Sequence, residues 1–313
     1  MKPIGIAVIG FGKIAADQHI PAIAANDRFR LLATSSRSGV GPEPSFTDWR
    51  DLIRAVEGLE AVAITTPPGP RMAIAAECAA AGLHVLLEKP PAATLGEAEA
   101  LRGVNPDVTM FATWHARHNP AVFAAADLLA GQRIADMRIT WHEDVRKWHP
   151  GQDWIWEPGG FGVFDPGINA FSIASFIVPA HLFVTSAELH YPDNAHAPIA
   201  VEAELASPAA DGRIGCSLDW RREDGEEWTI AIRTTDGLDL RLESGGAVLQ
   251  VNGQRQDCAG MGEYPSIYAQ FGDLIDNRRS EVDLAPLRIV ADCLLVGRRI
   301  RAPAVEKSPP QTR

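Results

Sequence analysis

Cysteine is scarce in this chain of 313 residues, which contains only Cys78, Cys216, Cys258 and Cys293. These cysteines are scattered, and no two of them form the CxxC pair that zinc sites and redox motifs use. We therefore expect neither disulfide bonds nor a metal site. Scattered free cysteines fit a reducing compartment, so we expect a cytoplasmic protein.

The chain also lacks a surplus of positive charge and a long apolar run. Its formal net charge is −11, whereas surfaces that bind nucleic acid or anionic membranes are usually basic. No stretch approaches the roughly 20 apolar residues of a membrane-spanning helix. The apolar start IGIAVIG runs directly into glycines and is too short for a signal peptide. Nucleic acid and membrane are therefore not expected as partners, and small-molecule substrates remain open.

From Ile4 to about Trp114, short apolar runs alternate with helix-like stretches. The runs are rich in β-forming residues, as are strands buried on both faces of a parallel sheet. They read IGIAVI, FRLLATS, AVAITT, HVLLE and VTMFAT. Helices are predicted between them at Ala15–Ala25, Trp49–Val56, Arg71–Ala81 and Thr94–Leu101. The βαβαβ order predicts a doubly wound α/β domain over residues 1–118.

After Asn119 the pattern changes to runs in which apolar and polar residues alternate. This alternation predicts an α+β domain over residues 119–301, built on a large, mainly antiparallel sheet with one covered face. The alternating runs are VEAELA, RIGCSLDW, WTIAIRTT, LDLRLE and AVLQV, after a strand at Met137–Glu143. Helices are expected at Pro120–Leu129, Gly167–Phe176, Tyr264–Asp276 and Pro286–Arg299. Residues 302–313 resemble a disordered tail.

The first predicted strand ends in GFGKIA, a G-x-G-x-x-A turn that opens a helix within a βαβ unit. Gly10 permits the tight turn, Gly12 lets a pyrophosphate approach the backbone, and Ala15 keeps the helix close to the sheet. The helix N-terminus, which includes Lys13 and Ile14, offers free N–H groups to the phosphates. The motif predicts dinucleotide binding, with a plain strand–helix turn as the alternative.

The end of the second strand bears on the choice between NAD and NADP. NAD sites usually carry an acidic residue about 20 residues after the glycines, which bonds the ribose 2′-hydroxyl. Here the strand ends in Ser35, Ser36 and Arg37, and no acid appears before Glu43. The guanidinium of Arg37 can hold a 2′-phosphate with help from the serine hydroxyls, which favours NADP. The alternative is an arginine that stacks on adenine and leaves NADP and NAD equivalent.

Two further segments follow predicted strands, at the edge of the sheet where ligands bind in such folds. The segment TTPP includes Thr66, Pro67 and Pro68, and its prolines would stiffen a loop beside the dinucleotide. The segment EKPP includes Glu88 and Lys89, and a cation there can hold a sugar hydroxyl and stabilise developing negative charge. Each tetrapeptide alone fits a structural role as well as a functional one.

GFGKIA, TTPP, EKPP and the later GGFGVFDPGIN together resemble the Gfo/Idh/MocA oxidoreductases over nearly the whole chain. The resemblance implies a Rossmann domain, a second domain on an open antiparallel sheet, and hydride transfer with a nicotinamide cofactor. It also implies that Lys89, the lysine of the EKP motif, is catalytic. The family motif D-x-G-x-H ends here in asparagine: Asp165 matches, but Asn169 replaces the usual histidine. Because an amide cannot act as a base, Asn169 is expected to orient a hydroxyl.

EKPP, FATWHARHNPA, EDVRKWHPGQDWIWEPGG and FDPGIN resemble in particular the bacterial aldose 1-dehydrogenases that act on L-arabinose and D-galactose. The resemblance implies oxidation of an aldopyranose at C1 to the lactone, with Lys89 or Asp165 taking the hydroxyl proton. Two alternatives remain open. One is an inositol or other polyol dehydrogenase of the same family, and the other is an NAD(P)-binding regulator without turnover.

The run WHPGQDWIWEPGGFGVFDPGIN concentrates three of the eight tryptophans. A pyranose presents hydroxyls at its rim and C–H patches on its faces, so its site needs both aromatic surface and polar groups. Trp148, His149 and Trp154 are the candidates from this run, and Trp154 and Trp156 can point in opposite directions, leaving one in the core.

Three further candidates lie outside that run. His115 follows the last strand of the first domain, Glu143 ends the first strand of the second domain, and Trp228 fits either the site or the core. The remaining histidines are expected to be ordinary helix, strand or surface residues: His19, His84, His118, His142, His181, His190 and His196. The second sheet needs a cover for its open face, and the resemblance implies a partner subunit's sheet, giving a homodimer or homotetramer.

Overall fold

The computed structural model describes residues 2–42 and 44–305, which form two compact units. The first unit contains the residues up to His118 together with Met261–Leu284. The second contains Asn119–Gly260 together with the residues from Ala285 onward. The continuous second domain expected over residues 119–301 is therefore interrupted, because one segment of it returns to the first unit.

The first unit is built on a six-stranded parallel sheet in the order β3-β2-β1-β4-β5-β6. This order confirms the doubly wound fold, and it reverses between β1 and β4, where such sheets bind ligands. The strands are β1 (Ile4–Ile9), β2 (Phe29–Ser35), β3 (Ser45–Phe46), β4 (Ala61–Ile64), β5 (His84–Leu87) and β6 (Met110–Ala112). The helical elements are η1 (Ala15–His19), α1 (Ile20–Ala24), α2 (Trp49–Ala55), α3 (Pro68–Ala80), α4 (Leu95–Leu101), η2 (His115–His118) and α8 (Glu263–Asp276).

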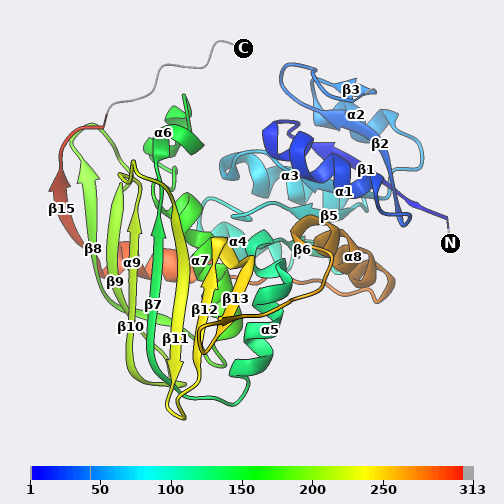
Figure 1. The fold of residues 1–313 in the computed structure, drawn as a ribbon. Coiled ribbons are helices and arrows are strands. Elements are labelled where there is room, and N and C mark those ends of the chain that lie inside the picture. The colour runs from blue at the N-terminus through cyan, green and yellow to red at the C-terminus, as the bar shows by residue number, and fades with distance from the viewer. Residues whose placement is uncertain (1, 43, 306–313) are drawn as a thin grey trace. The chain divides into compact units, whose positions relative to one another are not determined.

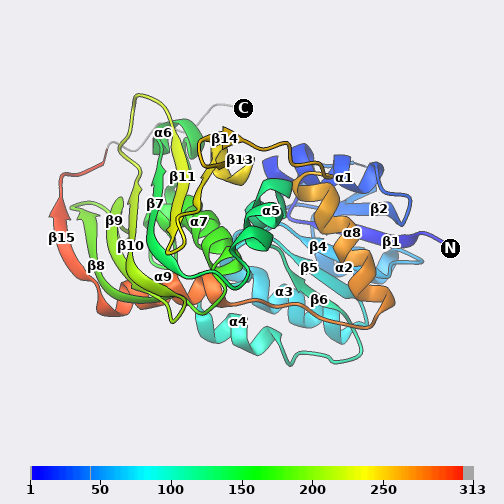
Figure 2. The same cartoon turned by 60° about the horizontal axis from the view of Figure 1, so that its bottom comes forward.

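Helix α8 belongs to this first unit although the chain reaches it late. Its buried residues Tyr264, Ile267 and Phe271 recur at helical spacing and share one apolar core with residues of β1 and α1. Figure 2 shows α8 beside α1. The ring of Phe271 stacks on Phe29 of β2 with 5.7 Å between centroids. The sequence pattern predicts this helix correctly but places it in the wrong domain, since amphipathic spacing does not identify the core that a helix joins.

The second unit is built on a nine-stranded sheet in the order β14-β13-β12-β11-β7-β10-β9-β8-β15. Most neighbouring strands are antiparallel, as predicted, and β7 with β10 and β8 with β15 are parallel. The strands are β7 (Ile134–His142), β8 (Phe183–Pro192), β9 (Ala200–Ala206), β10 (Ala210–Asp219), β11 (Glu227–Thr234), β12 (Asp239–Glu243), β13 (Val248–Val251), β14 (Gln254–Arg255) and β15 (Arg298–Ala302). The helical elements are α5 (Pro120–Leu129), α6 (Val145–Trp148), η3 (Asp153–Trp156), α7 (Phe164–Ile177), η4 (Ser244–Gly246) and α9 (Ala285–Val296).

Helices α7 and α9 cover one face of this sheet, against β7, β11 and β8 (Figure 1). Gly167 lets α7 approach closely, because a Cβ atom there would lie 2.5 Å from a methyl carbon of Leu218 in β10. The other face is polar: Arg213 pairs with Glu204 there, and Arg138 lies 3.8 Å from Glu202. Within residues 2–42 and 44–305, no helix lies over that polar face (Figure 1).

The sequence pattern misses β8 and β15, which pair at one edge of the sheet. A register shift between Val184 and Ser186 breaks the alternation of β8, and β15 is short and mostly charged. Ala302, expected in the disordered tail, is a buried residue of β15, and the backbone of Val305 bonds the side chain of Asn194. Residues 306–313 of that expected tail lie outside the described residues.

Candidate active site

The glycine-rich turn of the first unit needs glycine at its first position. Gly10 has a φ of 100°, and a Cβ atom there would lie 2.6 Å from the backbone nitrogen of Thr66. A Cβ atom at Gly12 would meet only the carbonyl oxygen of Gly10, at 3.8 Å. The backbone at Gly12 is therefore left uncovered, and this cradle fits the pyrophosphate of a dinucleotide.

The other residues predicted to contact the cofactor differ in burial and in hydrogen bonding. Ala15 is fully buried, Lys13 and Ile14 are exposed, and Lys13 pairs with Asp17. The hydroxyl of Thr66 is buried and lacks a hydrogen-bond partner within the part of the chain that the structure describes. Pro67 caps the N-terminus of α3, and Pro68 is its first residue. An unpartnered buried hydroxyl beside an open glycine backbone is consistent with a dinucleotide site.

At the end of β2, the main chain of Ser35 and the hydroxyl of Ser36 bond other protein groups, whereas the side chain of Arg37 is exposed. The carbonyl oxygen of Ser35 accepts hydrogen bonds from the backbone nitrogens of Gly10 and Phe11, at 2.8 and 2.9 Å. The hydroxyl of Ser36 donates to the carbonyl oxygen of Val40 at 2.8 Å, and the side chain of Arg37 is exposed. Arg37 is thus the charged group of this segment that is open to a ligand phosphate.

Glu88 is turned into the protein. Its side chain is 3% exposed, and its Oε1 atom accepts hydrogen bonds from the Tyr264 hydroxyl at 2.6 Å and from Nε2 of His19 at 3.1 Å. Its Oε2 atom accepts from the backbone nitrogen of Lys89 at 2.8 Å. Burial by itself raises the pKa of Glu88, but the hydrogen bond and charge of His19, with His115 and Tyr264, lower that pKa overall. The carboxylate expected at the cofactor therefore faces protein donors.

His115 lies in the same unit as Lys89, and it is paired. Its Nδ1 atom lies 2.9 Å from Oε2 of Glu263, and its ring stacks on Tyr264. Burial lowers the pKa of His115, but the hydrogen bond and charge of Glu263, together with Glu88, raise it overall against the opposing charge of Lys89. Lys89 itself is half-buried and lies just after β5. A carboxylate-paired imidazole and an ammonium group thus belong to one electrostatic cluster.

Glu143 in the second unit is held by two tryptophans. The indole nitrogen of Trp220 donates to its Oε1 atom at 3.0 Å, and that of Trp228 donates to its Oε2 atom at 2.9 Å. Trp228 also packs against Trp148, whose ring centroid is 5.6 Å away and whose side chain is 45% exposed. Trp228 is half-buried, which is compatible with both the core and the predicted substrate role, and Trp148 presents an aromatic surface outward.

His149 and Asp165 lie together, with 3.5 Å between Nε2 and Oδ2. The ring of His149 also contacts Trp220, with 5.0 Å between centroids. Asp165 is buried in the first turn of α7, where the helix dipole favours a carboxylate. Asn169 lies one turn later, and its Oδ1 atom is buried without a hydrogen-bond partner among the residues described. This arrangement offers a carboxylate–imidazole pair and an unfilled acceptor.

The two tryptophans of η3 differ in burial. Trp156 is buried and packs edge-on against Trp220 at 5.3 Å, so it belongs to the core. Trp154 is half-buried. The substrate role predicted for Trp154 remains a prediction, and its burial is compatible with that role.

Several residues of these clusters escape sequence reasoning. His19 is expected to be an ordinary helix histidine, and it bonds Glu88 instead. Arg71, Trp220, Glu263 and Tyr264 carry no local signal, since their partners are far away in the sequence.

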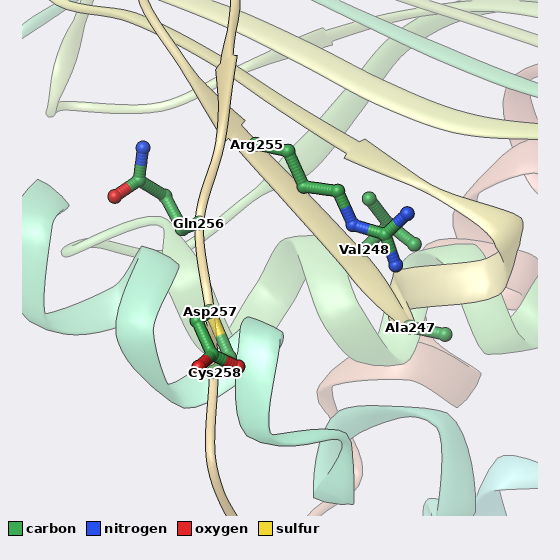
Figure 3. Close-up of a pocket in the computed structure, with 6 residues that line it drawn as sticks. All are labelled: Ala247, Val248, Arg255, Gln256, Asp257 and Cys258. Carbon is green, nitrogen blue, oxygen red and sulfur yellow. The ribbon is translucent and has the colours of Figure 1, made fainter.

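A hollow of about 340 Å³ beside β13 and β14 contains none of the predicted site residues (Figure 3). In the described part of the chain, no group of three or more His, Cys, Asp or Glu side chains is arranged to hold a metal ion, and no helix there has the length and apolarity to cross a membrane.

Comparison with known proteins gives consistent similarities. The model of the Gfo/Idh/MocA proteins, an oxidoreductase family with an NAD-binding Rossmann fold, matches residues 4–104. The chain is 43% identical over 307 residues to galactose 1-dehydrogenase of Pseudomonas fluorescens, covering 97% of this chain and 99% of that protein. It is 28% identical over 260 residues to D-xylose 1-dehydrogenase (NADP(+)) 2 of Haloferax volcanii, covering 78% and 75%. The crystal structure of D-galactose-1-dehydrogenase from Rhizobium etli matches with a TM-score of 0.92 at 42% identity, over 98% of this chain and 99% of that one.

Proposed function

This chain belongs to the Gfo/Idh/MocA family of oxidoreductases, and from that premise we propose that it oxidises an aldopyranose at C1 to the aldonolactone. D-galactose and L-arabinose are the proposed substrates. Two relatives that match over nearly the full length, at 43% and 42% identity, are named galactose 1-dehydrogenases, which supports the first sugar. The two pyranoses share configuration at C2–C4 and differ by a hydroxymethyl group at C5, and one extra apolar group rarely discriminates strongly.

The observation that carries this proposal is the pairing of His149 with Asp165 one helical turn before Asn169. Oxidation at C1 requires a group that takes the proton of the C1 hydroxyl as the carbonyl forms. Asp165 and Lys89 are the two candidates for that proton. The unfilled Oδ1 atom of Asn169 is suited to accept a hydrogen bond from a sugar hydroxyl and so to orient it.

The cofactor is proposed to be NADP, with NAD as the alternative. The turn formed at Gly10 and the uncovered backbone at Gly12 would hold the pyrophosphate, and Ser36 with Arg37 would face the adenine ribose. When bound, the nicotinamide supplies the acceptor for the hydride that leaves C1. The relative from Haloferax volcanii is named for NADP, which supports this preference.

Aromatic surface and fixed polar groups support a sugar as the substrate. Trp148 exposes a ring that can cover the C–H face of a pyranose. Glu143 is held by Trp220 and by Trp228, which packs against Trp148, and these two hydrogen bonds would keep its carboxylate rigid. His115 and Trp154 are the further proposed contacts.

We also propose that the chain assembles as a homodimer or homotetramer through the polar face of the nine-stranded sheet. That face carries paired charges such as Arg213 with Glu204, which can meet their counterparts on a second copy. A cytoplasmic location is proposed too, since all four cysteines are unpaired.

A panel of sugars tests the proposed function directly. D-galactose, L-arabinose, D-glucose and myo-inositol would each be mixed with NADP⁺ or NAD⁺, and reduction followed by near-ultraviolet absorbance. Fast reduction with the two aldoses, with lactone trapped as its hydroxamate, is expected. A preference for inositol would favour the polyol dehydrogenase instead. Tight cofactor binding without reduction by any of the compounds would favour the regulator.

A further inference from the structure

The main chain around Lys89 is fixed on both sides. Upstream, the carbonyl oxygen of Leu87 accepts hydrogen bonds from the backbone nitrogen and the hydroxyl of Thr113, each at 2.9 Å. The backbone nitrogen of Glu88 donates to the carbonyl oxygen of Ile64 at 3.1 Å. The backbone nitrogen of Lys89 donates to the side chain of Glu88 at 2.8 Å. Buried main-chain groups require such partners, and here side chains provide several of them.

Arg71 connects the two loops that follow β4 and β5. This arginine is 4% exposed and lies in the first turns of α3. Its guanidinium donates to the carbonyl oxygens of Thr66, Glu88 and Pro90. One planar group therefore ties the TTPP segment to the carbonyls on either side of Lys89. A lysine in this position would donate from one ammonium nitrogen, whereas the guanidinium of arginine donates from several nitrogens in a fixed plane.

Glu88 provides the opposite charge on the other side of the segment. Because an ionised carboxylate can only accept hydrogen bonds, Nε2 of His19 carries the proton that faces it. Nδ1 of His19 lies 2.8 Å from the Tyr268 hydroxyl, and Tyr264 donates directly to Glu88. Two side-chain donors, His19 and Tyr264, thus hold a carboxylate that has almost no exposure, and this carboxylate accepts a third hydrogen bond from the backbone nitrogen of Lys89.

Buried charges are costly, and well-packed apolar residues often stabilise a fold as well as or better than they do. A positively charged and a negatively charged side chain, both buried and both bonded to the same four-residue segment, therefore call for a role other than stability. Each of them bonds the main chain next to Lys89. A side chain is held in place best when the backbone that carries it cannot move.

We propose that Arg71 and Glu88 are positioning residues, which fix the backbone on both sides of Lys89 so that its ammonium group is held ready for the reaction. His19 and Tyr264 keep Glu88 in place. This inference rests on the proposed function only in taking Lys89 as a catalytic residue. It also replaces the direct cofactor contact expected of Glu88 with an action through Lys89.

The test uses Glu88→Gln, Arg71→Lys and the milder Tyr264→Phe, each alone and combined with Lys89→Ala. Glutamine keeps the shape of Glu88 but turns one acceptor into a donor that faces other donors. We expect kcat to fall roughly 10- to 100-fold in the first two variants and less in the third. The dissociation constant of NADP⁺, measured by fluorescence titration, should stay within about two-fold because these three side chains are buried and bond protein groups. In the Lys89→Ala background the same substitutions should change the residual rate by less than about two-fold.

The exposed pair Arg50 and Glu77 in the same unit provides the matched control, and Arg50→Lys and Glu77→Gln should leave kcat unchanged. Two results would overturn the inference: wild-type kcat in both Glu88→Gln and Arg71→Lys, or equal losses with and without Lys89. If wild-type protein oxidises no sugar, the proposed function fails, and crystal structures then decide the positioning role. A Lys89 side chain displaced in Glu88→Gln supports that role, and an unmoved one overturns it. Should Glu88→Gln fail to fold, the comparison rests on Tyr264→Phe.

Discussion

Nε2 of His149 lies 3.5 Å from Oδ2 of Asp165, so an imidazole from the loop after α6 faces the first turn of α7. The helix itself has Asn169 where the related family motif has histidine. The imidazole near this carboxylate thus comes from another segment. An imidazole that donates to an aspartate orients the carboxylate and stabilises its charge.

Asp165→Asn should lower kcat for D-galactose by about 10²-fold or more, because general acid–base groups contribute roughly 10²–10⁴. His149→Gln should cost less, about 10-fold, because it acts through Asp165 and the substrate. Steady-state kinetics at saturating cofactor measure both effects. His181→Gln, an exposed histidine of the same unit, is the control and should behave as wild type. Near-normal turnover of Asp165→Asn would remove this carboxylate from the mechanism.

Arg37→Ala should weaken NADP⁺ binding by about 10- to 100-fold, since a hydrogen bond to a charged group contributes about 1.5–3 kcal/mol. The binding of NAD⁺, which lacks the 2′-phosphate, should change little. Arg30→Ala provides the control, because Arg30 is an exposed arginine on the same strand. Calorimetric titration of both cofactors measures the difference. Equal losses for NADP⁺ and NAD⁺ would show that Arg37 contacts the part that they share.

Five strands of the parallel sheet in the first unit are predictable because each lies in a short apolar run between turn residues, whereas the two-residue β3 (Ser45–Phe46) forms no such run and is missed. β4, for example, is buried along its whole length. The position of α8 is not predictable in the same way. Tyr264, Ile267 and Phe271 show that this helix has a buried face, but the ring of Phe29 that receives it lies more than two hundred residues earlier. The periodicity of a sequence reveals that a helix has a buried face, but it does not reveal which core that face joins.

The residues of the candidate site likewise fall into those that the sequence predicts and those that it misses. Lys89, His149 and Asp165 are predicted for the site from sequence: Lys89 follows a strand, Asp165 belongs to an ordered motif, and His149 adjoins Trp148 outside regular structure. Arg71 and His19 are missed, since a charged residue on a helix is usually solvated and only the fold reveals that it is buried. Sequence therefore identifies the groups that chemistry requires more readily than the groups that hold them.

Gly10→Ala should destabilise the protein by about 3 kcal/mol or more, because strain at a positive φ is joined by a collision with the main chain. The added Cβ atom would lie 2.6 Å from the backbone nitrogen of Thr66. Gly58→Ala is the matched control, since Gly58 has a φ of 73° and open space around it. That control should lose only about 1–2 kcal/mol. Urea unfolding measures the loss of stability in both variants. Equal losses would mean that the structure around Thr66 shifts to accommodate the added Cβ atom at little cost.

The pKa of His118 is lowered to about 4, chiefly because burial disfavours the charged ring and secondarily because Arg117 and His115 repel it. Between about pH 6.5 and pH 4 the unfolded chain therefore binds a proton that the folded chain does not. Stability should fall as the pH drops through this window, by roughly 3 kcal/mol in all. His118→Gln should remove that part of the pH dependence. As the pH falls from about 7 to about 5, the free energy of unfolding of the variant should therefore rise relative to that of the wild type. Urea unfolding at the two pH values measures this, and parallel curves for the two proteins would contradict it.

Ala231→Lys should dissociate the proposed assembly. Ala231 lies between the buried residues Ile230 and Ile232 of β11, so it faces the polar side of the sheet. It pairs across the strands with Arg138 and Arg241, and a lysine there would add a third cation and project bulk outward. Wild-type protein is expected to sediment at twice or four times the chain mass of 33.8 kDa, and the variant as a monomer. Ala55→Lys, which adds the same charge at an exposed position of α2, should keep the assembly. A wild-type monomer would end the proposal that this face binds a second copy, and an intact assembly in Ala231→Lys would move the interface to another surface.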